Sequence, residues 1–151
     1  MGSEFDVILE TEINVFEVTV EVGFLGPQGV PGETTLNYTA GVNVSGHHAV
    51  TYDTTGKAVY ASNTELLHMG KILGITHNAA LIGDSVVVRK YGYIDEPSWS
   101  WDTDKPVYLG ENGALTQVVP EQPLSKFILV LGYPVTPTKL FVNIGTPITL
   151  I

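Results

Sequence analysis

The sequence predicts an all-β protein. We expect a small antiparallel β-sandwich or barrel-like C-terminal domain over residues 40–151, preceded by a β-rich N-terminal arm and a short Gly-X-Y linker. Short apolar stretches alternate with turn residues at intervals of about 8–12 residues, which is typical of all-β sandwiches and barrels. No stretch of ten residues shows the spacing of an amphipathic helix, so the pattern excludes an α/β fold.

Length and composition limit the classes of function. The 151 residues suit one domain with an appendage. Charged residues make up only 15% of the chain, which predicts a surface that is uncharged or covered by another subunit. The absence of cysteine excludes disulfides, thiolate chemistry and Cys-ligated zinc. Because no apolar run is long enough to cross a bilayer and no signal-peptide pattern opens the chain, we expect no membrane partner.

The net charge of −9 is concentrated in the N-terminal part. No Lys or Arg precedes Lys57, so the first 56 residues carry eight acidic side chains and a charge of −8, which leaves −1 for the other 95. An acidic arm repels phosphate backbones, and we therefore expect no nucleic-acid partner. The arm suits a basic protein surface, with simple solvation as the alternative.

The N-terminal arm is predicted to be an anchor. Residues 1–5 read as the translation of two adjacent cloning sites and are left out of the fold prediction, so the anchor segment is 6–22. Its apolar positions are Ile13, Val15, Phe16, Val18, Val20 and Val22. The last four alternate with polar residues, as in a half-buried strand. The first two follow the other phase, which predicts a turn or bulge near Asn14.

Four consecutive Gly-X-Y triplets follow the arm and begin at Gly23, Gly26, Gly29 and Gly32. Collagen requires glycine at every third position because only glycine fits at the axis of three chains. Four triplets are too few to hold a triple helix alone, but they would extend a trimer nucleated by the flanking domains. We therefore place a collagen-like linker at 23–39 and predict a homotrimer. The alternative is a stiff linker in a monomer.

Ten short runs are the candidate strands of the C-terminal domain: 49–52, 58–61, 71–76, 85–90, 91–94, 107–109, 115–119, 127–134, 139–144 and 148–151. Thr55-Gly56 and Asn112-Gly113 predict turns. Pro134 and Pro137 predict a turn at Val135-Thr136, between the last two long strands. Residues 64–69 are the only stretch predicted to make a helical turn.

Candidates for catalysis are few. Gly83-Asp84-Ser85 matches the serine motif of one esterase class, whose base comes from an Asp-x-x-His near the C-terminus. Here the last histidine, His77, precedes the serine, so we interpret the triplet as a turn before a strand. His47, His48, His68 and His77 lack metal-ligand spacing. We expect no enzyme activity, no metal and no cofactor.

Trp99 and Trp101 are the candidate binding or interface residues. They share one face of an extended segment and would stack on a sugar or anchor a subunit contact, with core packing as the alternative. Asp95, Glu96, Asp102 and Asp104 flank them. These carboxylates match no calcium-loop pattern and are interpreted as loop charges.

Several segments resemble a known family. The acidic, valine-rich arm ends in Glu-Val-Gly and leads into Gly-Pro-Gln-Gly-Val-Pro-Gly, as in many structural proteins of tailed bacteriophages. The segments that begin Ser45-Gly-His-His-Ala-Val, Gly56-Lys-Ala-Val-Tyr-Ala and Gly70-Lys-Ile-Leu-Gly-Ile-Thr are similar to a small β-domain of phage head-fibre and capsid-decorating proteins. So are Glu96-Pro-Ser-Trp-Ser-Trp, Lys105-Pro-Val-Tyr-Leu-Gly, Gly113-Ala-Leu-Thr-Gln and Thr138-Lys-Leu-Phe-Val-Asn-Ile-Gly-Thr-Pro-Ile.

This resemblance implies a protein of the virion surface that docks on the major capsid protein through segment 6–22 and displays the β-domain outward. It supplies no catalytic residues. Because similar linkers also occur in tail fibres, the alternative is a receptor-binding fibre tip or adhesin that recognises host-surface glycans. A third alternative, an esterase, requires a reactive Ser85.

Overall fold

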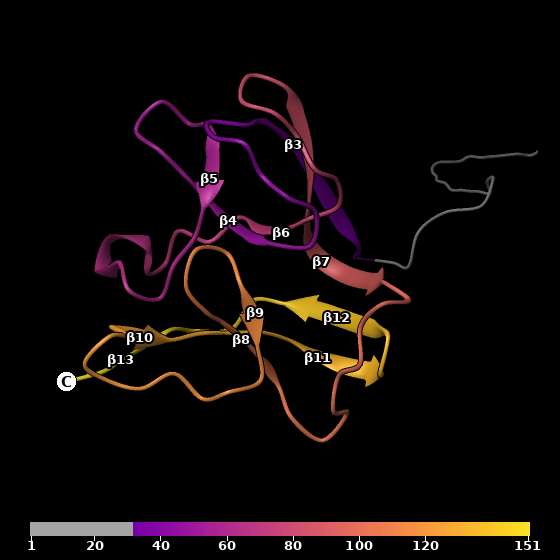
Figure 1. Cartoon of the computed structure of the whole chain (residues 1–151), viewed down its shortest axis with the longest axis vertical. Helices are drawn as coiled ribbons and strands as arrows, with labels where there is room; N and C mark the ends of the chain where they lie inside the picture. Colours follow the sequence, from indigo (N-terminus) through magenta and orange to yellow (C-terminus); the bar gives the residue numbers. More distant parts are fainter. Residues whose placement is uncertain (1–31) are drawn as a thin grey trace, which may run out of the picture. The chain divides into compact units, whose positions relative to one another are not determined.

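The computed structural model describes residues 32–151, which form one all-β unit without an α-helix (Figure 1). The predicted all-β class is confirmed. Its elements are β3 (Thr34–Thr39), β4 (Ala49–Tyr52), β5 (Ala58–Tyr60), the 3₁₀ turn η1 (Leu66–His68), β6 (Gly74–Thr76), β7 (Ser85–Asp95), β8 (Val107–Leu109), β9 (Leu115–Thr116), β10 (Phe127–Ile128), β11 (Val130–Thr136), β12 (Lys139–Asn143) and β13 (Ile148–Thr149).

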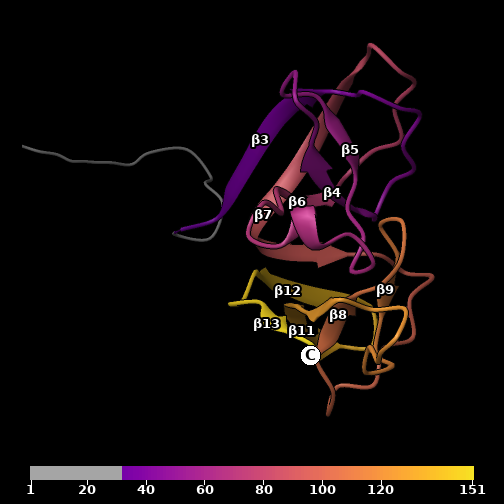
Figure 2. The ribbon, with the colours of Figure 1, turned by 90° about the vertical axis from the view of Figure 1, so that its left-hand side faces the viewer.

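The long strand β7 joins two halves of one antiparallel sheet. The sheet order is β5-β4-β6-β7-β12-β11-β8-β9, and β3 also pairs with β7. Tyr91 of β7 pairs with Thr34 of β3 and with Asn143 of β12, so these two strands lie on opposite edges of β7. Figures 1 and 2 show β3–β6 on one side of β7 and β8–β13 on the other. On that second side β10 and β13 pair only with each other, as a separate two-stranded antiparallel sheet.

One half of the sheet is curled like a barrel. The strands run in the order β3-β7-β6-β4-β5, and a bridge between Ala40 and Ala58 links β5 back to the residue that follows β3. The Gly41 amide strengthens this closure by donating to the Ala58 carbonyl at 2.7 Å. Of the two predicted architectures, the structure therefore has the barrel-like one.

The domain has two apolar cores, and β7 contributes to both. The barrel-like half buries Ala40, Val44, Val50, Ala58, Val86 and Val88. The other cluster buries Ala49, Ala61, Ile75, Ile94, Val107, Leu109, Phe127, Leu129, Leu131, Leu140 and Val142. β7 places Val86 and Val88 in one core and Ile94 in the other. Ala49 of β4 and Ile75 of β6 also belong to the second core, so strands of both halves line it.

The predicted linker is wrong in its last part. Residues 34–39 were assigned to the linker, but they form β3, in which half-buried and exposed side chains alternate along β7. Gly32 has a φ of +88°, whereas a collagen-like chain needs a φ near −75°. The backbone of the fourth triplet is therefore a turn that leads into the sheet. The anchor segment 6–22, with its apolar positions, and the glycines 23, 26 and 29 lie outside the described residues.

The predicted strands of the C-terminal domain differ from the observed ones mainly at their ends. Residues 85–90 and 91–94 form the single strand β7, and the run 127–134 is split at Leu129 into β10 and β11. The last long hairpin turns at Pro137-Thr138 rather than at Val135-Thr136. A shift of register after Pro134 lets β11 continue to Thr136, which still pairs with Lys139.

Gly74 gives the first testable prediction, because β6 has no room for a side chain there. Its φ is +150°, and a Cβ would collide with the backbone carbonyl of Arg89 on β7. Gly74→Ala should lower the free energy of unfolding by about 3 kcal/mol or prevent folding.

The matched control is Gly56→Ala. Gly56 also has a positive φ, but no atom lies within 4 Å of the site of its Cβ. This variant should lose only about 1 kcal/mol. Urea unfolding measures both variants, and equal losses would contradict the close approach of β6 to β7.

Candidate functional site

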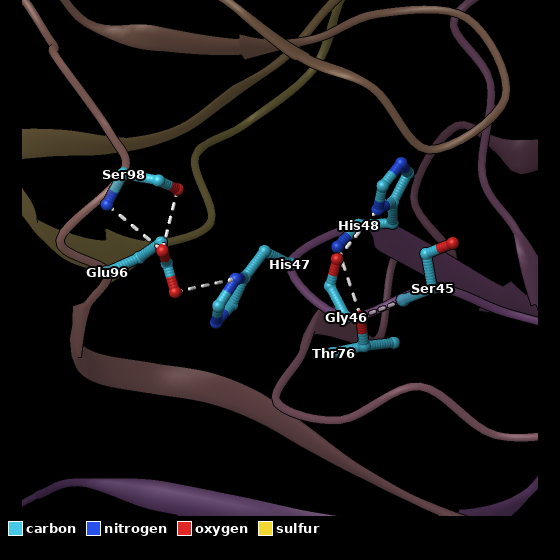
Figure 3. Close-up of polar contacts among 7 residues, drawn as sticks. All are labelled: Ser45, Gly46, His47, His48, Thr76, Glu96 and Ser98. Carbon is cyan, nitrogen blue, oxygen red and sulfur yellow. Dashed lines mark hydrogen bonds and ion pairs between the residues drawn. The ribbon is translucent and has the colours of Figure 1, made fainter.

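Two loops bring a histidine, a carboxylate and two tryptophans together. His47 lies on the loop between β3 and β4, three residues after Val44, which forms an isolated β-bridge with Ala80. Glu96 and Trp99 lie on the loop that follows β7. Figure 3 shows the carboxylate of Glu96 facing the ring of His47, with Oε1 at 3.7 Å from Nδ1. The ring centroids of His47 and Trp99 are 5.2 Å apart. We call His47, Glu96, Trp99 and Trp101 the histidine–tryptophan cluster.

Buried Thr76 holds the histidine loop in place. Its hydroxyl donates to the Ser45 carbonyl at 2.7 Å and accepts from the His48 amide at 3.0 Å (Figure 3). The His47 amide donates to the Thr76 carbonyl at 2.8 Å. His47 has a φ of +58°, so the loop turns sharply at this residue, and these bonds stabilise a conformation that residues other than glycine rarely adopt.

Glu96 is fixed by Ser98. Its Oε2 accepts from the Ser98 hydroxyl at 2.6 Å and from the Ser98 amide at 3.0 Å. These two hydrogen bonds, with a smaller contribution from His47, hold the pKa of the Glu96 carboxyl below its ordinary value. Glu96 therefore carries its negative charge and is aimed at His47.

The two tryptophans pack against the apolar core. Their ring centroids are 5.5 Å apart at an interplanar angle of 55°, and both are partly buried against the cluster that contains Ile94 and Leu140. The Trp101 amide donates to the Pro137 carbonyl at 2.8 Å, which ties this loop to the β11–β12 hairpin. The rings are tilted, so they do not form one flat platform for a sugar.

The other predicted catalytic groups lie apart. Ser85 is exposed at the start of β7, and within residues 32–151 no hydrogen bond joins its hydroxyl to a histidine. His68 accepts from the Ser62 amide at 3.0 Å through Nδ1, and His48 packs at 5.5 Å from the Tyr60 ring. The described residues hold no group of three His, Asp or Glu side chains that is suited to a metal ion.

A polar group beside β7 is not predicted by the sequence. Glu33 lies 3.6 Å from the Arg89 guanidinium, and its Oε2 accepts from the Tyr93 amide at 3.1 Å. Both charges act on the pKa of His77, which Arg89 lowers and Glu33 raises. Sequence reasoning missed the group because Glu33 was assigned to the linker, and only the pairing of β3 with β7 brings it here.

The comparisons with known proteins give no relative. No protein-family model matches the chain, and neither a curated protein nor a solved structure does. Within residues 32–151, none of the helical segments has the length and apolar character of a membrane span.

His77 gives the second prediction. Burial lowers its pKa below the ordinary 6.5, with further lowering by Arg89 and His47 and opposition from Glu33. In residues 32–151 its Nε2 is buried without a hydrogen-bond partner. Below pH 6.5 the unfolded chain therefore binds a proton at His77 more readily than the folded chain does. The contribution of neutral His77 to the free energy of unfolding is thus present above pH 6.5 and is lost as the pH falls.

The test compares the parent with His77→Gln, which does not titrate. Thermal unfolding followed by circular dichroism at about pH 7 and about pH 5.5 should show a smaller loss of Tm for the variant. A spectrum at the higher pH checks that the variant is folded. An identical loss of Tm in both proteins would contradict the assignment of this pH dependence to His77.

Proposed function

We propose that the chain is a structural protein of a tailed-phage virion, a capsid-decorating or head-fibre protein without enzyme activity. Segment 6–22 docks on the major capsid protein, the Gly-X-Y residues are a short stem, and the β-domain is displayed as a homotrimer. The observation that supports this proposal is the order of the parts along the chain, in which the Gly-X-Y triplets of the sequence come directly before the compact β-unit. The last Gly-X-Y glycine, Gly32, is also the first residue of the compact unit, and β3 begins two residues later.

The charge distribution supports separate roles for the two parts. Residues 1–31 contain six acidic residues and no basic one, whereas residues 32–151 contain ten acidic and seven basic ones. The respective net charges are −6 and −3, so the arm has two thirds of the charge in about a fifth of the length. An acidic arm suits a basic surface of another protein, and a weakly charged domain suits contact with copies of itself.

Exposed apolar side chains also support a protein that functions among others. Leu66 and Leu67 are exposed on η1, and Val118 and Val119 are exposed after β9. Apolar area that is exposed in contiguous patches is typical of surfaces that contact other proteins, and these adjacent side chains contribute such area. The tail-fibre alternative requires Trp99 and Trp101 to bind a glycan. Both side chains are partly buried against the core, which leaves less of their surface for a ligand, so we favour capsid decoration.

The third prediction tests the anchor. The full chain should co-sediment with capsids of the virus that encodes it, and a variant without residues 6–22 should not, because the anchor pattern is lost. A variant with residues 6–22 in scrambled order keeps the charge and composition but loses the alternation. If this variant still binds capsids, docking depends on the negative charge of segment 6–22 and not on a strand that this segment would form.

Three outcomes would count against the proposal. If the deletion variant binds as well as the full chain, the anchor assignment is wrong. If neither protein binds capsids, capsid decoration is wrong. If capsids are not bound but a glycan array shows saturable binding that Trp99→Ala removes, the chain is a receptor-binding protein instead. Circular dichroism of each variant confirms that the β-domain is folded.

A further inference from the structure

A groove of about 590 Å³ opens at the point where the described chain begins. It is lined by Gly32, Thr34, Ile72, Tyr91, Asn143 and Ile144, and we call it the stem groove. Lys90 is the only charged side chain in its lining. A smaller hollow of about 110 Å³ shares Ile72 and Ile144 and adds Leu129 and Pro147. The apolar surface therefore continues beyond the groove itself.

The stem groove is built on the junction of the sheet. Tyr91 pairs with Thr34 on one edge of β7 and with Asn143 on the other, so residues of three paired strands line the groove. The Tyr91 ring packs edge-on against Phe141 at 5.2 Å. Gly32 turns over this ring, and a Cβ at Gly32 would lie 3.4 Å from Tyr91 Cε2. The groove is thus a fixed surface beside Gly32, the residue that follows segment 23–31.

We infer that the stem groove is the contact between copies of the chain in the trimer. This inference rests on the proposed function, in which residues 23–31 of three chains wind around one axis. Pro31 is bonded to Gly32, so each of the three domains must begin beside that axis. The surface around Gly32 and Thr34 is then the part of each domain that is nearest to the other two.

The chemistry of the stem groove fits a second copy of this chain. Ile72, Tyr91 and Ile144 supply apolar surface, and Asn143 supplies an uncharged polar group at its rim. The opposite end of the β3–β7 ladder, where Thr39 pairs with Ser85, is about 17–20 Å away, as the rise of a six-residue strand requires. Ile82, held near that end by the Gly83 amide bonding to the Ala40 carbonyl, is therefore far from the axis.

The absence of cysteine allows a site-specific test in the full chain. Asn143→Cys places a thiol in the groove, and Ile82→Cys places one at the far end as the matched control, since both side chains are exposed. Light scattering first gives the mass, which should be three times 16.3 kDa for each variant. A short bismaleimide should then give a covalent dimer with Asn143→Cys and none above background with Ile82→Cys.

The outcomes separate this inference from the trimer itself. The mass of one chain would overturn the trimer and the contact together. If the mass is that of a trimer, three cross-linking results would overturn the groove contact but not the trimer. These are cross-linking of Ile82→Cys alone, equal cross-linking of both variants, and cross-linking of neither.

A second variant tests the contact without a reagent. Asn143→Arg would bring three positive charges together beside Lys90 and should reduce the mass to that of one chain, with an unchanged circular dichroism spectrum. Ile82→Arg should keep the trimer mass. A trimer with Asn143→Arg would overturn the inference.

Discussion

The whole domain depends on the pairing of β7 with three other strands. β3 lies along one edge of β7, and β6 and β12 follow one another along the other edge. The strand also supplies buried side chains to both cores. Gly92, with a φ of +120°, lies where the β3 ladder ends, and a side chain there would collide with Glu33. Backbone pairing and side-chain packing thus constrain the same short segment, at the end of the β3–β7 ladder that is nearest to Gly32.

Local signals predict the elements that depend on local sequence. The apolar runs of β4 and β8 give their observed ends, and Asn112-Gly113 forms its predicted turn with φ values of +48° and +80°. β3 was missed because Thr34-Thr-Leu-Asn-Tyr-Thr has only two large apolar residues and follows directly on a glycine repeat. Its strand conformation comes from pairing with β7, some fifty residues later in the chain. Such long-range pairing has no local signature.

The candidate site shows the same division. Residue type identifies Trp99 and Trp101 as notable, but their tilt and partial burial follow from the core beneath them. The His47–Glu96 contact joins two loops that are distant in sequence, and it depends on Thr76 holding one loop and Ser98 holding the carboxylate. The positive φ of His47 is likewise not predicted by the sequence, because only a few per cent of residues other than glycine adopt it. Composition can nominate such residues, whereas only the fold places them together.

The ladder of β3 on β7 gives the domain two distinct ends, with Gly32 at one and the loop that carries Leu81 and Ile82 at the other. Electron cryo-microscopy of capsids saturated with the protein tests the account most directly, because it reveals copy number and orientation together. The account predicts threefold density in which the Gly32 end of each domain faces the shell and the loop around Ile82 is outermost. Bare capsids, single domains, or domains with the Ile82 loop against the shell would contradict it.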